Sequence, residues 1–321
     1  MRLFRIKIAV ACLALWTLCA CRKDLLHWQL TQRLETHTTH RLNKILFVND
    51  SLGFAVGGER FNYADILITR DGGNTWRQDS FPQVGKGIYG ITQAPSGIIY
   101  TVGFDGKMLS TAGGGNWEFR QLRYEPCKGI AFATAGKAVV ITGVSFGIGS
   151  RQHIDSSGAM LQYDSLDFEQ NDICMADAQT GYIAAYGVVQ KTTDGGNSWQ
   201  FMDIRNDNFT AIDCHTPQQA WLCGAQGSIY KMTDGTHWER LRNGNDLTLP
   251  RYHLNDILFT DELHGYAVGE DGLVIYSDDG GYHWMEFDRF TDAALRCITE
   301  GPEGQLFTCG DNGSLYSIVK K

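Results

Sequence analysis

Three aspartates recur in one short phrase, in which a hydroxyl residue and one further residue precede Asp-Gly-Gly, and a tryptophan lies three positions after the second glycine. We call this phrase the Asp-box, and it occupies residues 69–76, 192–199 and 277–284. Its carboxylates and tryptophans are Asp71, Trp76, Asp194, Trp199, Asp279 and Trp284. A carboxylate beside a hydroxyl has the groups needed for acid–base catalysis or for binding calcium.

A structural role explains the Asp-box better than either chemistry. An active site occurs once in a chain, whereas this phrase repeats, and calcium requires six or more oxygen ligands. Thr69 and Asp71 can instead form hydrogen bonds with backbone groups of their own turn. Gly73 suits a backbone conformation that other residues avoid, and Trp76 can bury a large apolar face. We therefore predict a self-contained turn, with no catalytic residue, no metal site and no cofactor.

Each Asp-box ends a longer repeated unit. Residues 45–57 and 257–269 are both short apolar runs split by a polar turn, which is the pattern of a β-hairpin. A third strand, the Asp-box turn and a fourth strand follow. Four antiparallel strands in a unit that recurs along the chain indicate a β-propeller. The predicted fold is all-β, with four-stranded antiparallel blades.

Degenerate copies of the unit set the number of blades. Residues 110–117, 232–238 and 161–168 resemble the Asp-box imperfectly, and the last unit contains only three strands before Lys321. We predict that residues 28–35 supply its missing outer strand, which closes the ring and removes open sheet edges. The count is seven blades, or six or eight if 161–168 is misread. Tight turns that need positive φ are predicted at four Gly-x-x-Gly sites: 103–106, 224–227, 269–272 and 310–313.

The first 20 residues have the pattern of a bacterial secretion signal. Positive residues precede an apolar stretch, 8–18, that is too short to span a membrane. The stretch ends in Leu18-Cys19-Ala20-Cys21, which resembles a lipobox and implies cleavage before Cys21 and lipidation of that residue. An ordinary signal peptide cut near Ala20 is the alternative. We predict export and lipid anchoring to a bacterial membrane, on the periplasmic side or at the cell surface, with residues 21–27 as a short tether.

The charge of the mature chain limits its partners. Loss of residues 1–20 would remove three positive charges and no negative ones, and would lower the formal net charge from −8 to −11. Such an acidic protein is a poor match for nucleic acid or for anionic lipid. No linker-like stretch divides the rest, so residues 28–321 are predicted to form one propeller domain whose only membrane contact is its lipid.

Six cysteines lie beyond Cys21, and none forms a Cys-x-x-Cys pair that would suggest zinc or thiol redox chemistry. Disulfides are permitted outside the cytoplasm. Cys214 could meet Cys223 across one hairpin, and Cys297 could meet Cys309 across another. The alternative is that all six are small buried apolar residues.

The repeated unit resembles a known family. Residues 268–284 read Val-Gly-Glu-Asp-Gly-Leu-Val-Ile-Tyr-Ser-Asp-Asp-Gly-Gly-Tyr-His-Trp, which is similar to the repeat of the photosystem II assembly and stability factors and their non-photosynthetic bacterial relatives. The likeness spans roughly residues 28–321. It implies a lumenal or periplasmic propeller that holds a partner polypeptide with help from a basic surface patch.

Asp-boxes also occur in sialidases and related glycan-acting propellers. That resemblance implies an Arg-Ile-Pro phrase near the start, a Tyr nucleophile paired with Glu, and further arginines. None of the six prolines here follows Arg-Ile, so no residue is carried over as catalytic. We therefore predict a non-enzymatic propeller that binds a protein or peptide as an assembly factor or scaffold, with a glycan-binding or glycosidase-like surface protein as the alternative.

The ligand is expected on the face opposite the Asp-boxes. In a propeller, the turns between second and third strands and the connectors between blades share that face, which we call the upper face. Residues 58–64 and 144–157 break the Gly-x-x-Gly pattern there, and we expect them to form long loops that flank the second blade as walls of one cleft. The candidate ligand residues are Arg60, Phe61, Tyr63, Phe146, Arg151, His153, Arg251 and Tyr252.

Overall fold

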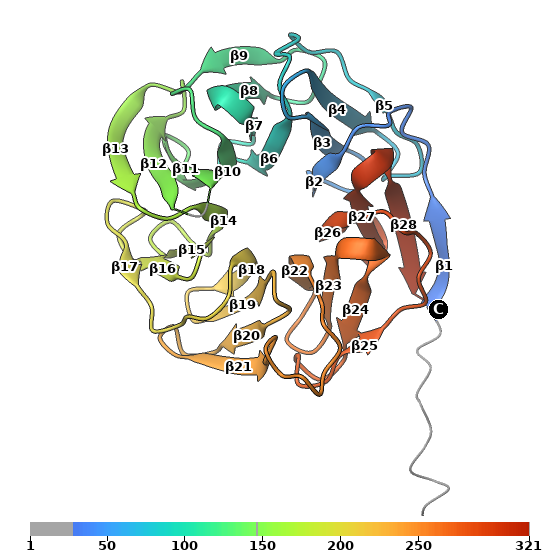
Figure 1. Cartoon of the computed structure of the whole chain (residues 1–321). Coiled ribbons are helices and arrows are strands. Elements are labelled where there is room, and N and C mark those ends of the chain that lie inside the picture. Colours follow the sequence, from blue (N-terminus) through green and yellow to red (C-terminus); the bar gives the residue numbers. More distant parts are fainter. Residues whose placement is uncertain (1–27, 146, 321) are drawn as a thin grey trace, which may run out of the picture.

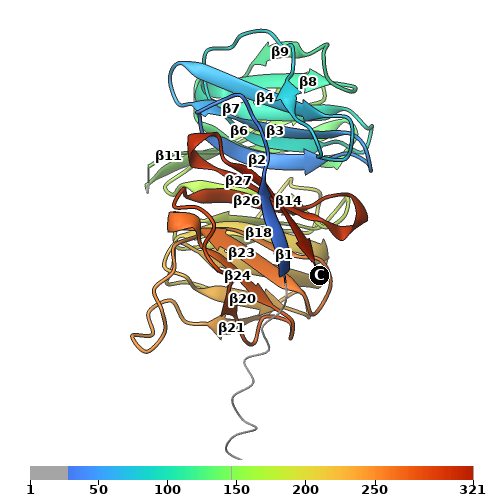
Figure 2. The same cartoon turned by 90° about the vertical axis from the view of Figure 1, so that its right-hand side faces the viewer.

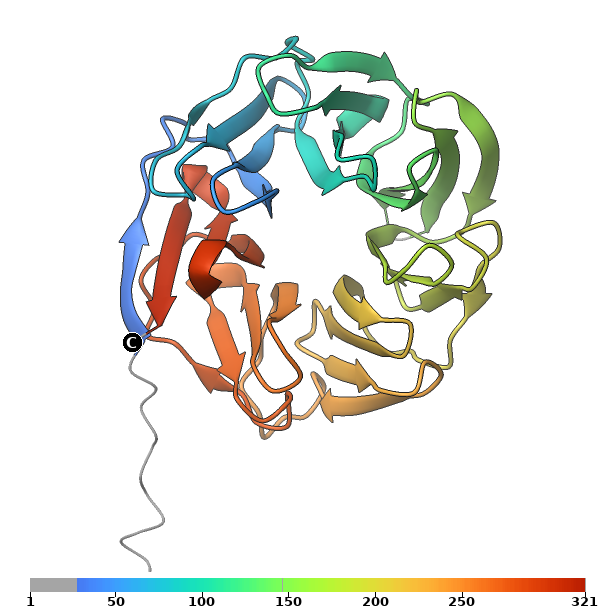
Figure 3. The same ribbon diagram turned by 180° about the vertical axis from the view of Figure 1, so that it is seen from behind.

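A computed structural model of the chain describes residues 28–145 and 147–320. These residues form seven four-stranded antiparallel sheets around a central axis, which confirms the predicted seven-bladed propeller (Figure 1). The opposite face shows the same closed ring (Figure 3). Within the described ranges, no helix has the length and apolar character needed to cross a membrane. The leader, the tether and Cys21 lie outside the described residues.

The blades follow one another along the chain. Blade 1 contains β2 (Leu42–Phe47), β3 (Gly53–Glu59), β4 (Tyr63–Thr69) and β5 (Arg77–Gln78). Blade 2 contains β6 (Ile88–Gln93), β7 (Ile99–Gly103), β8 (Lys107–Thr111) and β9 (Glu118–Gln121). Blade 3 contains β10 (Cys127–Thr134), β11 (Lys137–Ser145), β12 (Ile148–Asp155) and β13 (Met160–Leu166). Blade 4 contains β14 (Gln170–Met175), β15 (Gly181–Ala185), β16 (Val189–Thr192) and β17 (Gln200–Phe201).

The remaining blades complete the circle. Blade 5 contains β18 (Phe209–Thr216), β19 (Gln219–Gly224), β20 (Ile229–Met232) and β21 (Trp238–Arg242). Blade 6 contains β22 (Leu254–Phe259), β23 (Gly265–Gly269), β24 (Val274–Ser277) and β25 (Met285–Glu286). Blade 7 contains β26 (Leu295–Glu300), β27 (Leu306–Gly310), β28 (Leu315–Lys320) and β1 (Trp28–Arg33). Short 3-10 turns are η1 (Phe104–Gly106), η2 (Glu270–Gly272), η3 (Pro302–Gly304) and η4 (Asp311–Gly313).

The two ends of the chain close the ring, as predicted. Strand β1 pairs antiparallel with β28, with Trp28 opposite Lys320 and Arg33 opposite Tyr316 (Figure 2). The Leu34 amide continues the contact by donating to the Leu315 carbonyl at 2.9 Å. Blade 7 therefore has its outer strand, and β1 covers the edge that β28 would otherwise leave open.

The hydrophobic core lies between blades. Among the described residues, it divides into seven clusters, and each cluster joins the facing surfaces of two neighbouring sheets. In the cluster between blades 5 and 6, for example, Trp221 stacks on Phe259 with ring centroids 4.2 Å apart. No blade can bury its apolar faces alone, so the stability of each sheet depends on both of its neighbours.

A side-chain hydrogen bond links many neighbouring blades near the axis. The first strand of every blade has a register shift at the equivalent position, which is a β-bulge. At four bulges, the extra residue donates to a main-chain carbonyl of the next first strand, and we call these bonds clasps. The clasps are Asn43 to Ile88 (2.6 Å), Asn171 to Phe209 (2.8 Å), Thr210 to Leu254 (2.9 Å) and Asn255 to Leu295 (2.8 Å).

Blade 3 corrects two predictions. Residues 144–157 are not a long loop, because most of them form the end of β11 and all of β12. Residues 161–168 are not a degenerate Asp-box, since they belong mainly to the outer strand β13. The corresponding turn is at Asp155, whose Oδ1 accepts hydrogen bonds from the amides of Ser157 (2.8 Å) and Ala159 (3.0 Å). The number of blades is unaffected.

The cysteines follow neither hairpin pairing. Cys214 forms a disulfide with Cys174, and this bond joins the first strands of blades 4 and 5. Cys223 is a buried free thiol that lies opposite Ala211 rather than Cys214. Cys297 and Cys309 lie directly opposite one another in β26 and β27, but both are buried free thiols. The disulfide was missed because its cysteines belong to different blades.

Removal of one clasp tests its contribution to stability. Asn43→Ala is expected to lower the free energy of unfolding by about 1 kcal/mol, because it removes a hydrogen bond to a carbonyl of the buried residue Ile88. Denaturant unfolding measures the change. Asn116→Ala is the control, since Asn116 is exposed and donates no side-chain hydrogen bond within the described part of the chain. Equal stability of the two variants would contradict a role for the clasp.

Candidate functional site

The Asp-box carboxylates are used within their own turns. In each box, the hydroxyl of the first residue accepts the amide of the second glycine at 2.9 Å, and the aspartate accepts an amide four residues later, also at 2.9 Å. The indole of the tryptophan donates to the carbonyl of the second glycine at 2.8–3.1 Å. Burial opposes the charge of Asp194, but hydrogen bonds from Ser198 and Thr192 lower its pKa to about 2. These aspartates are therefore structural, because their carboxylates are charged and already hydrogen-bonded within their own turns.

In blade 2, the carboxylate of the imperfect Asp-box comes from a residue outside the box. Residues 110–117 contain no aspartate, but Asp79 from the preceding connector reaches them. Its Oδ2 accepts hydrogen bonds from the Gly115 amide (2.9 Å) and the Trp117 indole (2.8 Å). The turn therefore keeps its anion and adds a further link between blades 1 and 2.

A cavity of about 740 Å³ opens on the upper face at the mouth of the central channel, and we call it the mouth cavity. The hairpins of blades 1 and 3 both contribute to it, but only through residues 58–60 and 143–144 and not as two long loops. Residues 39–41 and 311–312 also line it, and 39–41 lie beside 58–60, since the Gly58 amide donates to the Arg41 carbonyl at 2.8 Å. Tyr89, Pro126, Lys128 and Glu169 complete the lining.

Two cavity residues occupy bulge positions that make no clasp. Tyr89 and Lys128 stand in blades 2 and 3 where Asn43, Asn171, Thr210 and Asn255 stand in their own blades. Their side chains line the cavity, and Lys128 forms an ion pair with Glu169 there. The mouth cavity thus lies beside the two first strands in which Tyr89 and Lys128 replace a clasp residue.

Most charges around the mouth cavity are paired. Asp311 binds Arg41 (2.7 Å) and Arg296 (3.0 Å), and these contacts hold the pKa of Asp311 below its usual range even though burial acts in the opposite direction. His40 Nδ1 lies 2.7 Å from Asp65. Among the described residues, Arg60 has no ion-pair partner, so its charge is the one left for a ligand.

Arg60 belongs to a partly exposed group of cations and aromatic rings on blades 1 and 2. Its guanidinium lies 5.4 Å from the ring centroid of Phe61 and 5.0 Å from that of Phe104. Lys86 lies 5.7 Å from Phe104, and the two rings meet edge to face at 5.2 Å. Phe61 is 58% exposed. We call Arg60, Phe61, Lys86 and Phe104 the basic-aromatic lobe, which suits an anionic and aromatic ligand.

The central channel is crossed below the mouth. Lys44 of blade 1 lies 3.2 Å from Asp256 of blade 6 and 4.0 Å from Asp172 of blade 4. Burial opposes its charge, but the two carboxylates raise the pKa of Lys44 well above its ordinary value. Blade 1 is not a neighbour of blade 4 or blade 6, so these contacts span the axis and place a cation on it.

The other candidate ligand residues are dispersed. Tyr63 is exposed and stacks on His40 at 4.7 Å, beside the mouth cavity. Arg251 is exposed on the connector before blade 6, but Tyr252 is buried beneath Arg242. Neither lines the mouth cavity. Phe146 lies outside the described residues.

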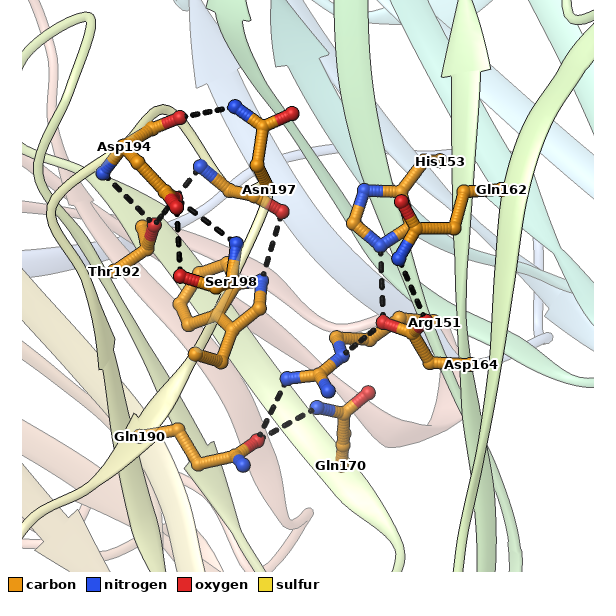
Figure 4. A network of polar contacts seen from close by, with 12 residues as sticks. Arg151, His153, Gln162, Asp164, Gln170, Gln190, Thr192, Asp194, Asn197 and Ser198 are labelled. Carbon is orange, nitrogen blue, oxygen red and sulfur yellow. Dashed lines mark hydrogen bonds and ion pairs between the residues drawn. The ribbon is translucent and has the colours of Figure 1, made fainter.

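The structure corrects the prediction for Arg151 and His153. Both side chains are buried in β12 rather than exposed on a loop. Asp164 Oδ2 lies 3.2 Å from Arg151 Nε and 3.1 Å from His153 Nε2 (Figure 4). Arg151 also donates to Gln190 of blade 4 at 3.1 Å. We call this group, with Gln162 and Gln170, the interblade network. It holds blades 3 and 4 together, and within it Arg151 and His153 are too buried to meet a ligand directly.

A Tyr–Glu pair is present, but not at the channel mouth. Tyr163 donates to Glu125 at 2.8 Å, and Arg123 covers the Tyr163 ring at 4.2 Å. Tyr163 lies on β13, the outermost strand of its blade. Burial and the hydrogen bond to Glu125 raise the pKa of Tyr163, which disfavours a nucleophilic phenolate. Within the described ranges, no group of three or more metal-binding side chains comes together.

Comparison with known proteins confirms the resemblance seen in the repeat. No family model matches the chain. Over 153 residues it is 23% identical to the photosystem II assembly lipoprotein Ycf48 of Synechococcus sp. (strain CC9902), a match that covers 46% of this chain and 45% of that protein. The matched part is therefore about half the length of that relative.

Solved structures share the fold. A YCF48 structure bound to a D1 peptide has a TM-score of 0.70 and 18% identity over 93% of this chain and 97% of its own. YCF48 from Cyanidioschyzon merolae has a TM-score of 0.69 and 17% identity over 91% and 99%. A streptogramin B lyase has a TM-score of 0.73 and 12% identity over 93% and 100%. Binding proteins and enzymes thus share this architecture.

The buried His153 predicts a loss of stability in mild acid. Burial lowers its pKa below 6.5, against the opposing charge of Asp164, so the unfolded chain binds this proton more readily than the folded chain. Stability is therefore complete above about pH 6.5 and falls as the pH drops toward the lowered pKa. We expect His153→Gln to flatten this fall in denaturant unfolding between pH 7 and 5. The exposed His237→Gln is the control, and parallel curves for His153→Gln and the wild type would contradict the assignment.

Proposed function

We propose that the chain is a lipid-anchored, non-enzymatic propeller that binds a polypeptide partner on its upper face, in an assembly or scaffold role. The observation that carries this proposal is Arg60, a cation without an ion-pair partner among the described residues, held over two aromatic rings at the edge of the mouth cavity. Arginine and aromatic side chains together are typical of the residues that dominate protein interfaces.

The similar proteins support the same proposal. Ycf48 is an assembly lipoprotein, and one of the similar structures holds a D1 peptide. The chain shares its fold with that peptide-bound propeller over nearly its whole length. A peptide of its own environment, recognised by the basic-aromatic lobe, is the proposed ligand.

The anchor and the upper face are proposed to point in opposite directions. Trp28 pairs with Lys320 at the end of β28, which places the start of β1 on the Asp-box face. Seven residue steps from Cys21 to Trp28 reach at most about 25 Å. The lipid would therefore hold the Asp-box face toward the membrane and leave the mouth cavity open to partners. Footprinting on membranes that protected 58–61 and left 71–75 open would contradict this orientation.

Photo-crosslinking tests where the partner binds. Benzoylphenylalanine in place of Phe61 is expected to give polypeptide adducts in cells, because Phe61 is exposed in the basic-aromatic lobe. Benzoylphenylalanine in place of Tyr282, which is 53% exposed in an Asp-box, is the matched control and should give none. Arg60→Glu should reduce the adduct yield at position 61 at least fivefold. Equal adducts at both positions, or none at 61, would count against the proposal.

Lipid anchoring is tested by cell fractionation. Cys21→Ser removes the proposed lipid attachment point and is expected to move the protein from the membrane pellet to the soluble fraction. Cys12→Ser, in the segment proposed to be cleaved, is the control and should leave the protein in the pellet. A Cys21→Ser protein that stays with the membranes would disprove anchoring through this residue.

A further inference from the structure

A second group of exposed side chains lies on the upper face, where blades 3 and 4 meet. Val144 and Ile148 flank the β11–β12 turn and are 50% and 59% exposed. Tyr186 follows β15 and Phe201 ends β17, and they are 43% and 63% exposed. We call these four residues the apolar lobe. Tyr186 and Phe201 border a shallow groove of about 490 Å³.

The groove has a rigid apolar floor. Phe168 lies in the buried cluster between blades 3 and 4, with Val188 packed against that cluster, and both line the groove. Phe201 packs against Phe168 with ring centroids 5.8 Å apart. Phe201 also pairs in register with Gln190, which the interblade network fixes from below. Part of its ring therefore packs on the groove floor, while most of it stays exposed to a ligand.

The groove and the mouth cavity share their dividing wall. In the β11–β12 hairpin, Val144 lines the mouth cavity and Gly147 lines the groove. In the connector before β14, Glu169 lines the mouth cavity, and Asp167 and Phe168 line the groove. A polypeptide that crosses this wall passes directly from one to the other.

Charge distinguishes the two sides. The groove is bordered by one charged side chain, Asp167, which would repel an acidic residue. The basic-aromatic lobe, on the other side of the mouth cavity, presents the free charge of Arg60. An extended chain with an acidic residue near one end and apolar residues farther along matches both sides in only one direction.

We propose that the apolar lobe is the second half of the peptide site, and that the partner segment is an extended peptide with an acidic residue followed at a distance by two or more large apolar side chains. The acidic residue binds at Arg60, and the apolar side chains pack on Ile148 and Phe201. This inference rests on the proposed function and specifies the class of ligand. A second copy of this chain on the lobe is the competing occupant.

The test uses a phage library of random 16-residue peptides, selected on the soluble propeller and remeasured as synthetic peptides by fluorescence anisotropy. We expect the selected peptides to contain Asp or Glu and, some residues away, Leu, Ile or Phe. Ile148→Ser together with Phe201→Ser should weaken their binding at least tenfold, which corresponds to about 1.4 kcal/mol. Leu263→Ser, at a 53% exposed position in the β22–β23 turn of the Asp-box face, is the matched control and should change affinity less than twofold.

The outcomes separate this inference from the function on which it rests. If the peptides lose affinity with Arg60→Glu but bind the Ile148→Ser/Phe201→Ser protein as well as the wild type, the apolar lobe is not part of the site and the proposed function stands. If no peptide is selected, or none responds to Arg60→Glu, both proposals fail. If the double variant converts a dimer to a monomer in sedimentation, the lobe is a self-association surface and this inference is overturned. An unchanged melting temperature shows that the double variant is folded.

Discussion

The structure depends on the contact that each first strand makes with the next one around the axis. Every blade buries its apolar faces only against its two neighbours, so the ring is stable only when all seven contacts form. A bulge at the same place in each first strand turns one side chain toward the following blade. Asn and Thr at four of these bulges satisfy a carbonyl there, and the geometry of the ring is thereby repeated with little variation.

Function is inferred where this repetition fails. Tyr89 and Lys128 occupy bulge positions without making a clasp, and both line the mouth cavity. Arg296, at the third such bulge, is held by Glu270 and Asp311. The two first strands without a clasp thus border the mouth cavity, and the ion pairs of Lys44 span the channel beneath it. A regular scaffold becomes a candidate binding site at two of the three exceptions to its own pattern.

The sequence was sufficient for the architecture, because the repeated phrase and the separated strand at 28–35 carry the blade count and the closure. It was not sufficient for blade 3, where β12 consists largely of polar residues. Arg151 and His153 are buried there because partners from β13 and blade 4 satisfy them, and those partners are distant in sequence. The disulfide between Cys174 and Cys214 was not predicted for the same reason, because its two cysteines are 40 residues apart in the sequence. The role of the Lys128 position could have been predicted from the sequence, since an alignment of the seven first strands places Lys128 in the same column as Asn43.

The pairing of β1 with β28 also orders the events of folding. The first strand of the domain pairs with the last one, so the sheet that both ends share cannot be completed until the whole domain has been synthesised. Its loop spans nearly the whole domain, and closing so long a loop is slow for entropic reasons. A chain that ends before residue 315 lacks β28, so β1 has no strand to pair with and blade 7 stays incomplete. An intact C-terminal strand is thus required for β1 to take its place in the ring.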